Sequence, residues 1–194
     1  MASYARLTSD DRRARLLELG VRLFSERPYD DYSMDELAGQ AGVSKGLLYH
    51  YFPSKRDYYM AALRSAAAEM LKLTEPDPGL PVAGQLVALL EAYLAYVLDH
   101  SAAYRAVLRG GIGTDLAVAQ IAEEVRHTLL HRVLRGLSTD QPSAVLRVAV
   151  RGWIGLVEAA SLDWIEHDDL SREALARLLA DMLPALVETA QAGH

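Results

Sequence analysis

The chain has 194 residues, 51% of them apolar and 24% charged, and these proportions are typical of a folded globular protein and exclude a disordered chain. It contains no cysteine, which excludes disulfide frameworks, thiolate nucleophiles and cysteine-bound zinc. Residues 1–65 carry ten basic and nine acidic side chains, so the net charge of −6 arises in the rest of the chain, and any contact with DNA depends on where individual cations lie.

The sequence gives no indication of a membrane protein or an enzyme. Its longest apolar runs stop well short of the roughly 20 residues that a spanning helix needs, and the charged N-terminus lacks the apolar core of a secretory signal. It also has no glycine-rich phosphate loop and no supported Ser-His-Asp pattern. We therefore expect a cytoplasmic protein with no membrane partner, no catalytic residue, no cofactor and no metal site.

The N-terminal third predicts three helices in close succession. Apolar residues recur at spacings of three and four with no sustained alternation, which indicates an all-α fold. A first helix is expected from Ser9 to just before Pro28. Ser33 then opens a short second helix with the Ser-x-x-Glu spacing of a capping box, and Gly42 supplies the turn after it. Ser44 caps the third.

Proline and serine place the remaining boundaries. Pro53 stops the third helix, and Ser54 caps a fourth that is expected to run from Lys55 to about Leu73. Residues 74–81, TEPDPGLP, contain three prolines and a glycine and form the clearest break in the chain. Further helices are expected near residues 82–100, 102–108, 115–136, 142–166 and 171–192, which gives about nine helices in total.

The second and third helices have the arrangement of a helix-turn-helix, in which the second helix of the pair enters a DNA major groove. At 100° per residue, one arc of the third helix holds residues 47, 48, 51 and 52 and faces inward. The opposite arc carries an ammonium, a bare backbone, a phenol and an imidazole, which suit contacts with bases and phosphates. These residues are Lys45, Gly46, Tyr49 and His50.

The string LAGQAGVSKGLLYHYFPSKRDYYMAAL, from Leu37 to Leu63, resembles the DNA-binding module of the TetR family of bacterial regulators. The resemblance implies DNA contacts at Ser33, Ser44, Lys45, Gly46, Tyr49, His50, Tyr51 and Lys55, with Lys55 on a phosphate. Leu47 departs from the family, which often has threonine or serine there, so one phosphate contact is missing from the pattern. The alternative is that the aromatics are core residues, the lysines solvated and the serines only caps.

Two helices of the body carry stripes suited to a dimer interface. Small residues on the helix after Pro142 allow another helix to approach closely, and apolar residues recur on the last helix. The expected interface residues are Val148, Gly152, Gly155, Ala159, Leu175, Leu178 and Met182. The resemblance implies that these two helices pair with those of a second subunit as a four-helix bundle. The alternative is that both stripes pack inside one subunit.

Aromatic and apolar residues of the body could line a small-molecule pocket, and the resemblance implies an inducer site there. The expected lining residues are Tyr93, Val97, Tyr104, Trp153 and Val157. A plain aromatic core is the alternative, and Glu158 either meets a cationic ligand or faces solvent. His127 and His131 have a metal-ligand spacing, but the arginines beside them favour a solvated face.

These patterns predict two domains: a helix-turn-helix domain over residues 9–69, and a ligand-binding and dimerisation domain over residues 70–194. The expected function is that of a ligand-responsive transcriptional regulator. We expect a repressor that binds a palindromic operator in double-stranded DNA as a homodimer, and that a small-molecule inducer of unknown identity releases. The alternatives are an activator or global regulator of the same fold, or a helical ligand-binding protein without a DNA function.

Overall fold

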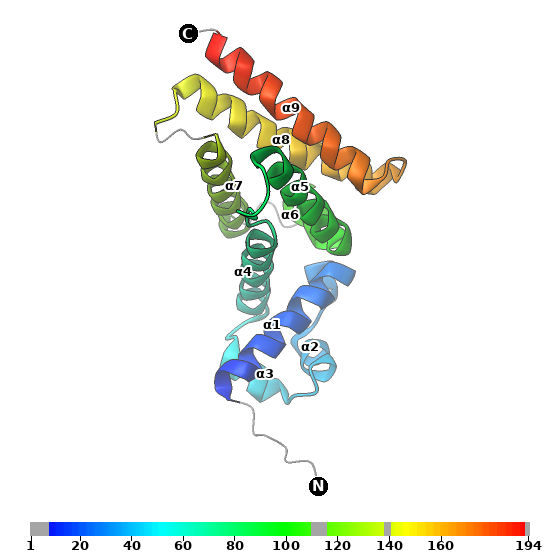
Figure 1. Ribbon diagram of the computed structural model, residues 1–194. Coiled ribbons are helices and arrows are strands. Elements are labelled where there is room, and N and C mark those ends of the chain that lie inside the picture. The colour runs from blue at the N-terminus through cyan, green and yellow to red at the C-terminus, as the bar shows by residue number, and fades with distance from the viewer. Residues whose placement is uncertain (1–7, 110–115, 138–140, 193–194) are drawn as a thin grey trace. The chain divides into compact units, whose positions relative to one another are not determined.

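The computed structural model describes residues 8–109, 116–137 and 141–192, and Figure 1 shows their arrangement into helices. Within these ranges the chain forms nine α-helices and one 3₁₀ turn, with no strand, which confirms the predicted all-α fold. The elements are α1 (Ser9–Glu26), η1 (Tyr29–Asp31), α2 (Met34–Gln40), α3 (Lys45–Tyr51), α4 (Lys55–Leu73), α5 (Val82–Asp99), α6 (Ser101–Arg109), α7 (Leu116–Gly136), α8 (Ala144–His167) and α9 (Arg172–Ala192).

The helix boundaries agree with the predicted ones to within two residues, apart from the expected start at residue 115, which lies outside the described ranges. One local prediction is wrong. Ser33 does cap α2 by accepting a hydrogen bond from the Glu36 backbone N–H at 3.1 Å, but the Glu36 carboxylate pairs with Arg27. The reciprocal capping box forms instead at α1, between Thr8 and Asp11.

The chain divides into two compact units. The first contains the chain up to Ala68 together with the segment that begins at Ala102 and ends at Val118, and the second contains the rest. The division falls inside α4, so this helix starts in the first unit and ends in the second.

The core of the first unit is a cluster of aromatic rings around Phe24. The rings of Tyr32, Tyr58 and Tyr59 meet Phe24 edge to face, with centroids between 4.9 and 5.7 Å away. Burial of the phenols does not leave their hydroxyls without partners: Tyr32 donates to the Leu23 carbonyl at 2.7 Å, and Tyr58 donates to a carbonyl of α1. The cluster therefore fixes α4 and the η1 region against α1.

The core of the second unit is formed by α5, α8 and α9, which pack on one another, and Figure 1 shows α8 and α9 side by side. Its tryptophans tie the chain together through their indole N–H groups. Trp153 of α8 donates to the Leu179 carbonyl of α9 at 2.9 Å, and Trp164 donates to the Leu170 carbonyl at 2.8 Å. Both rings are buried, so each indole combines apolar packing with a satisfied donor.

The C-terminal end of α4 is closed by an arginine of α7. The Arg132 guanidinium donates to the Leu71 carbonyl at 2.6 Å and to the Thr74 carbonyl at 3.3 Å. The Thr74 hydroxyl is fully buried and donates to the Met70 carbonyl at 2.8 Å. The carbonyls left without partners at a helix end are thus satisfied by a cation, which also opposes the negative end of the helix dipole.

Candidate DNA-binding surface and helical body

The turn between α2 and α3 depends on glycine. Gly42 has a φ of 63°, in the left-handed region that side chains rarely adopt. The chain is closed over this turn by a hydrogen bond from the Val43 N–H to the Ala38 carbonyl at 3.1 Å. Leu37 and Leu48 are both fully buried and hold the two helices together. The glycine turn and the two buried leucines thus set the angle between α2 and α3.

The two faces of α3 are separated as predicted. Leu48 is 0% and Phe52 2% exposed, whereas Tyr49 is 41% exposed. Lys45, Gly46 and His50 are also exposed, and a Cβ added to Gly46 would meet nothing within 4 Å. The outward arc therefore offers hydrogen-bonding groups around a position where a second molecule can approach the helix backbone.

Two serines begin the helices of this surface. The Ser33 hydroxyl accepts a hydrogen bond from the Glu36 N–H at 3.1 Å, and the Ser44 hydroxyl accepts one from the Leu47 N–H at 3.2 Å. Each bond uses an oxygen lone pair, which leaves the hydroxyl hydrogen available for donation. Both serines are exposed, so a helix-capping role and donation to a phosphate oxygen are compatible.

Lys45 is held by a carboxylate of the preceding helix. Its ammonium lies 2.6 Å from Asp35 Oδ2, and about half or more of each side chain remains exposed. The hydrogen bond that Lys45 donates to Asp35 raises the pKa of Lys45 above its ordinary value, with a further contribution from Tyr49. Sequence reasoning missed Asp35, because its spacing from Lys45 follows no helical period and the contact depends on the angle between α2 and α3.

Lys55 has a structural role in addition to the one expected of it. Its ammonium donates to the Tyr32 carbonyl at 2.8 Å and to the Tyr29 carbonyl at 3.2 Å, and it lies 4.2 Å from the centroid of the Tyr29 ring. The side chain is half-buried. Lys55 therefore secures the η1 turn to the start of α4, a role that the sequence pattern did not indicate.

Tyr51 and Leu47 lie on the arc of α3 that is predicted to face inward. Both are half-buried, whereas Leu48 and Phe52 on the same arc are buried. The Tyr51 hydroxyl lies 3.3 Å from the Ser9 hydroxyl at the start of α1, with either atom as the donor. Tyr51 therefore connects α3 to α1.

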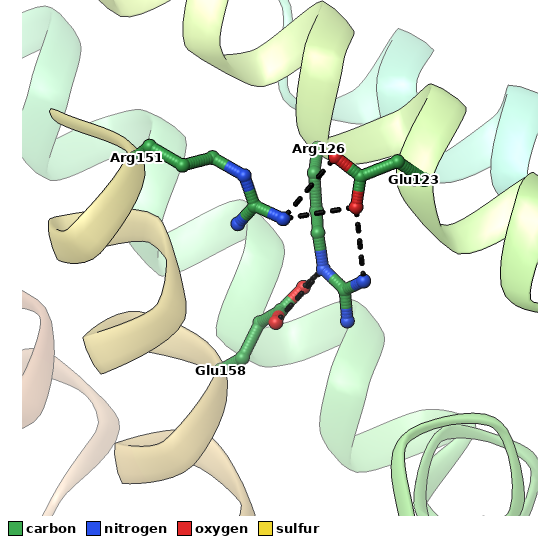
Figure 2. Close-up of polar contacts among 4 residues, drawn as sticks. All are labelled: Glu123, Arg126, Arg151 and Glu158. Carbon is green, nitrogen blue, oxygen red and sulfur yellow. Dashed lines mark hydrogen bonds and ion pairs between the residues drawn. The ribbon is translucent and has the colours of Figure 1, made fainter. Parts of the chain in front are cut away.

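A chain of alternating charges joins α7 to α8 in the second unit, and Figure 2 shows its four side chains pointing toward one another. Arg126 donates through Nε to both Glu158 oxygens, at 2.7 and 3.0 Å. Glu123 accepts from Arg126 at 3.3 Å and from Arg151 at 2.9 Å. The hydrogen bonds that Arg126 donates to Glu158 raise the pKa of Arg126. The sequence left two alternatives for Glu158, contact with a cationic ligand or exposure to solvent. In the structure Glu158 instead pairs with an arginine of its own chain.

The stripe expected to mediate dimerisation is largely exposed in the single chain. On α8, Val148 is 60% exposed, and Cβ atoms added at Gly152 or Gly155 would meet nothing within 4 Å. On α9, Leu178 is 50% and Met182 39% exposed. Ala159 is exposed as well.

Leu175 differs from the other residues expected on this stripe because it is buried in the single chain. Leu175 is 3% exposed and lies in the core of its own subunit, because it falls on the side of α9 that carries the buried residues Ala176 and Leu179. Helical periodicity identifies a stripe, but a wide apolar helix has both an inner and an outer part, and Leu175 belongs to the inner one.

Four of the five residues expected to line a pocket are buried in the described part of the second unit. Tyr93 and Val97 lie on α5, and Trp153 and Val157 on α8, each less than 9% exposed. Tyr104 is half-buried on α6, in the first unit. The Trp153 indole is already engaged with a backbone carbonyl of α9, so its ring has a packing role whether or not a ligand binds.

The two histidines of α7 face each other. The Nε2 atoms of His127 and His131 are 3.2 Å apart, and both side chains are exposed. Among the described residues, no group of three or more metal-ligating side chains gathers at one point.

None of the described helices is by itself long and apolar enough to cross a membrane, although Ala83–Asp99 and Ser101–Leu108 together meet the length and composition test as a bent pair.

Comparison with known proteins identifies both parts of the chain. Residues 16–61 match the model described as bacterial regulatory proteins, tetR family, and residues 82–186 match the model described as the C-terminal domain of tetracyclin repressor-like proteins. The latter match covers more than half of the chain. The protein therefore belongs to the TetR family of transcriptional regulators, which confirms the resemblance seen in the sequence.

Individual relatives agree with this assignment. The chain is 30% identical to the HTH-type transcriptional activator FasR of Mycolicibacterium smegmatis, over 84% of this chain and 76% of FasR. It is 29% identical to the HTH-type transcriptional repressor KstR2 of Rhodococcus jostii, over 88% of this chain and 75% of KstR2. A tetR-family regulator of Streptomyces coelicolor superposes with a TM-score of 0.89 at 30% identity, over 97% of this chain and 85% of the other. All three are named as regulators of transcription.

Proposed function

We propose that this regulator is a cytoplasmic repressor that binds a palindromic operator as a homodimer and that a small-molecule inducer releases. The observation that carries the proposal is the outward arc of α3, where polar groups surround Gly46 while Leu48 on the opposite side is fully buried. This arc has the size and chemistry that a major groove accepts.

The DNA contacts divide into base-reading and positioning groups. We assign base contacts to Lys45, Gly46, Tyr49 and His50, since these residues occupy the outward arc. Backbone phosphates are the proposed partners of three residues at helix starts and of Tyr51, because such contacts fix register without reading sequence. These are Ser33, Ser44, Tyr51 and Lys55.

Dimerisation is proposed through α8 and α9. Val148, Leu178 and Met182 are exposed apolar side chains, and the glycines and Ala159 leave room for helices of a second subunit. Symmetric dimers read half-sites about one helical turn apart, so one such interface doubles the number of DNA contacts. Together these features support a four-helix interface between two copies.

We place inducer binding in a body domain over residues 70–194 and DNA binding in a domain over residues 9–69. Tyr93, Val97, Trp153 and Val157, which all belong to the second unit, remain the proposed lining. A ligand that prefers one arrangement of the dimer by about 3 kcal/mol would weaken operator binding roughly a hundredfold without touching DNA.

Activation of transcription is the second candidate. The observation that favours it is the 30% identity to FasR, whose name describes an activator, against 29% to the repressor KstR2. A repressor and an activator would use the same DNA-binding surface. Reporter transcription in a deletion strain separates them, since loss of a repressor raises transcription from the bound promoter and loss of an activator lowers it.

The test of DNA binding is selection of duplexes from a random-sequence library, followed by gel-shift titration of the selected site. We expect enrichment of a palindrome and binding by a dimer, with competition by the selected duplex far stronger than by a random one. Failure to enrich any sequence, with a folded dimeric protein, would overturn the proposal.

A further inference from the structure

We propose that Asp35 sets the DNA affinity of this protein by competing with DNA for the ammonium of Lys45. The proposal deepens the function proposed above and depends on it. It makes Asp35 a positioning residue, which acts on DNA binding through Lys45.

The geometry makes this competition direct. The Asp35 carboxylate lies 2.6 Å from Lys45 Nζ, and this contact joins the first turn of α2 to the first turn of α3. Lys45 is the one lysine among the four residues of the outward arc, and DNA presents phosphate and base oxygens to an ammonium that reaches into a groove. An N–H of the ammonium that is donated to Asp35 is not available to DNA, and the carboxylate beside it offsets the positive charge that would attract a phosphate.

The energetics permit the exchange. The side chains are 51% exposed for Lys45 and 67% for Asp35, and ion pairs this exposed contribute little to stability because water and salt screen them. Breaking an ion pair that is weak in water costs little free energy when DNA binds. This cost still makes the free energy of DNA binding less favourable. Asp35 therefore lowers affinity without blocking binding.

The same pair also changes the response to salt. A free ammonium that neutralises a phosphate releases a condensed cation from DNA, which makes log K fall more steeply with log salt, by about 0.9 per contact. An ammonium that arrives already paired brings no net charge, so the release is smaller. Removing the Asp35 charge is expected to steepen the salt dependence by up to about 0.9 per subunit.

The experiment compares Asp35→Asn with the wild-type protein by fluorescence titration of the selected duplex over a series of salt concentrations. We expect affinity to rise roughly three- to tenfold at low salt and the slope to steepen. Asp31→Asn is the matched control, since Asp31 is an exposed carboxylate shortly before the same helix and its removal changes the net charge equally. Asp35→Glu keeps the charge and should bind like the wild type.

A double-mutant cycle separates competition for Lys45 from simple repulsion of DNA by Asp35. In a Lys45→Ala background, Asp35→Asn should lose most of its effect. Three results would overturn the inference. The first is a full gain of affinity from Asp35→Asn in the Lys45→Ala background. The others, in the protein that retains Lys45, are a gain of affinity no larger than that of Asp31→Asn, and weaker binding by Asp35→Asn. Absence of DNA binding by the wild-type protein would instead show that the proposed function itself is wrong.

Discussion

The ring of Tyr58 occupies the space that a side chain at Gly20 would need. A Cβ on Gly20 would lie 3.0 Å from two atoms of that ring, and Tyr58 is fully buried and hydrogen-bonded to α1, so it cannot move aside. This contact lets α1 and α4 approach closely. Glycine at position 20 is therefore required by packing and not by backbone conformation.

Gly20→Ala is expected to destabilise the protein by about 1–3 kcal/mol, the usual cost of overpacking a core. Gly39→Ala is the matched control, because Gly39 is also helical and its added Cβ would meet nothing within 4 Å. That substitution should leave stability unchanged or raise it by roughly 0.4–1 kcal/mol. Chemical unfolding measures both, and equal effects of the two substitutions would contradict the packing argument.

Tyr58 should also make the protein sensitive to alkali. Burial raises its pKa from 10.0 to about 12, so the folded protein holds this proton more tightly than the unfolded chain. The stabilisation is complete below pH 10 and is lost as the pH rises toward 12, by up to about 2.7 kcal/mol.

Tyr58→Phe should remove that part of the alkaline loss while costing about 1 kcal/mol at neutral pH for the lost hydrogen bond. Tyr49→Phe is the control, because Tyr49 is 41% exposed. Unfolding midpoints measured between pH 8 and pH 11 test the difference. If both variants lose stability with pH as the wild type does, Tyr58 does not carry the effect.

Glu158→Gln is expected to destabilise the body by about 1–2 kcal/mol, because it leaves the half-buried Arg126 guanidinium without its main charged partner. Glu188→Gln on α9 removes the same charge from an exposed position and should have little effect. Thermal unfolding compares the two. A double variant with Arg126→Met should recover part of the loss, and no recovery would argue against a direct pair.

The two lysines should respond differently to alanine. Lys45→Ala is expected to weaken binding to the selected duplex and relax preference at one or two base pairs, with unfolding unchanged. Lys55→Ala should weaken binding about equally on all duplexes and also lower stability by about 1–3 kcal/mol, because two carbonyls lose their donor. Unchanged stability of Lys55→Ala would contradict its structural role.

Leu178→Glu is expected to convert the dimer to monomers, because a carboxylate on the exposed stripe would be buried without a partner. Leu170→Glu is the control, since Leu170 is 48% exposed, against 50% for Leu178, but lies before α9 and outside the stripe. Sedimentation velocity distinguishes monomer from dimer. A dimeric Leu178→Glu protein would place the interface elsewhere.

The sequence allowed the helices to be predicted because their ends are determined locally. Ser33 and Ser44 cap the helices that follow them, and Pro53 separates α3 from α4. The outward arc of α3 was predictable for the same reason, since it follows from helical geometry alone.

The missed features all join residues that are distant or out of phase in the sequence. Arg126 and Glu158 are 32 residues apart, and the pairing of Lys55 with two carbonyls depends on a short 3₁₀ turn with no sequence signal of its own. The burial of Leu175 was not predicted, because an apolar period does not say how wide the buried face of a helix is. Tertiary packing decides each of these points.

The separation of the two faces of α3 has a consequence for evolution. Leu48 and Phe52 anchor the helix, whereas the side chains at positions 45, 49 and 50 are exposed and contribute little to the core. Mutations at these three positions can therefore accumulate while the protein stays folded. A duplicated gene could acquire a new operator through a few such changes, with every intermediate remaining a stable protein.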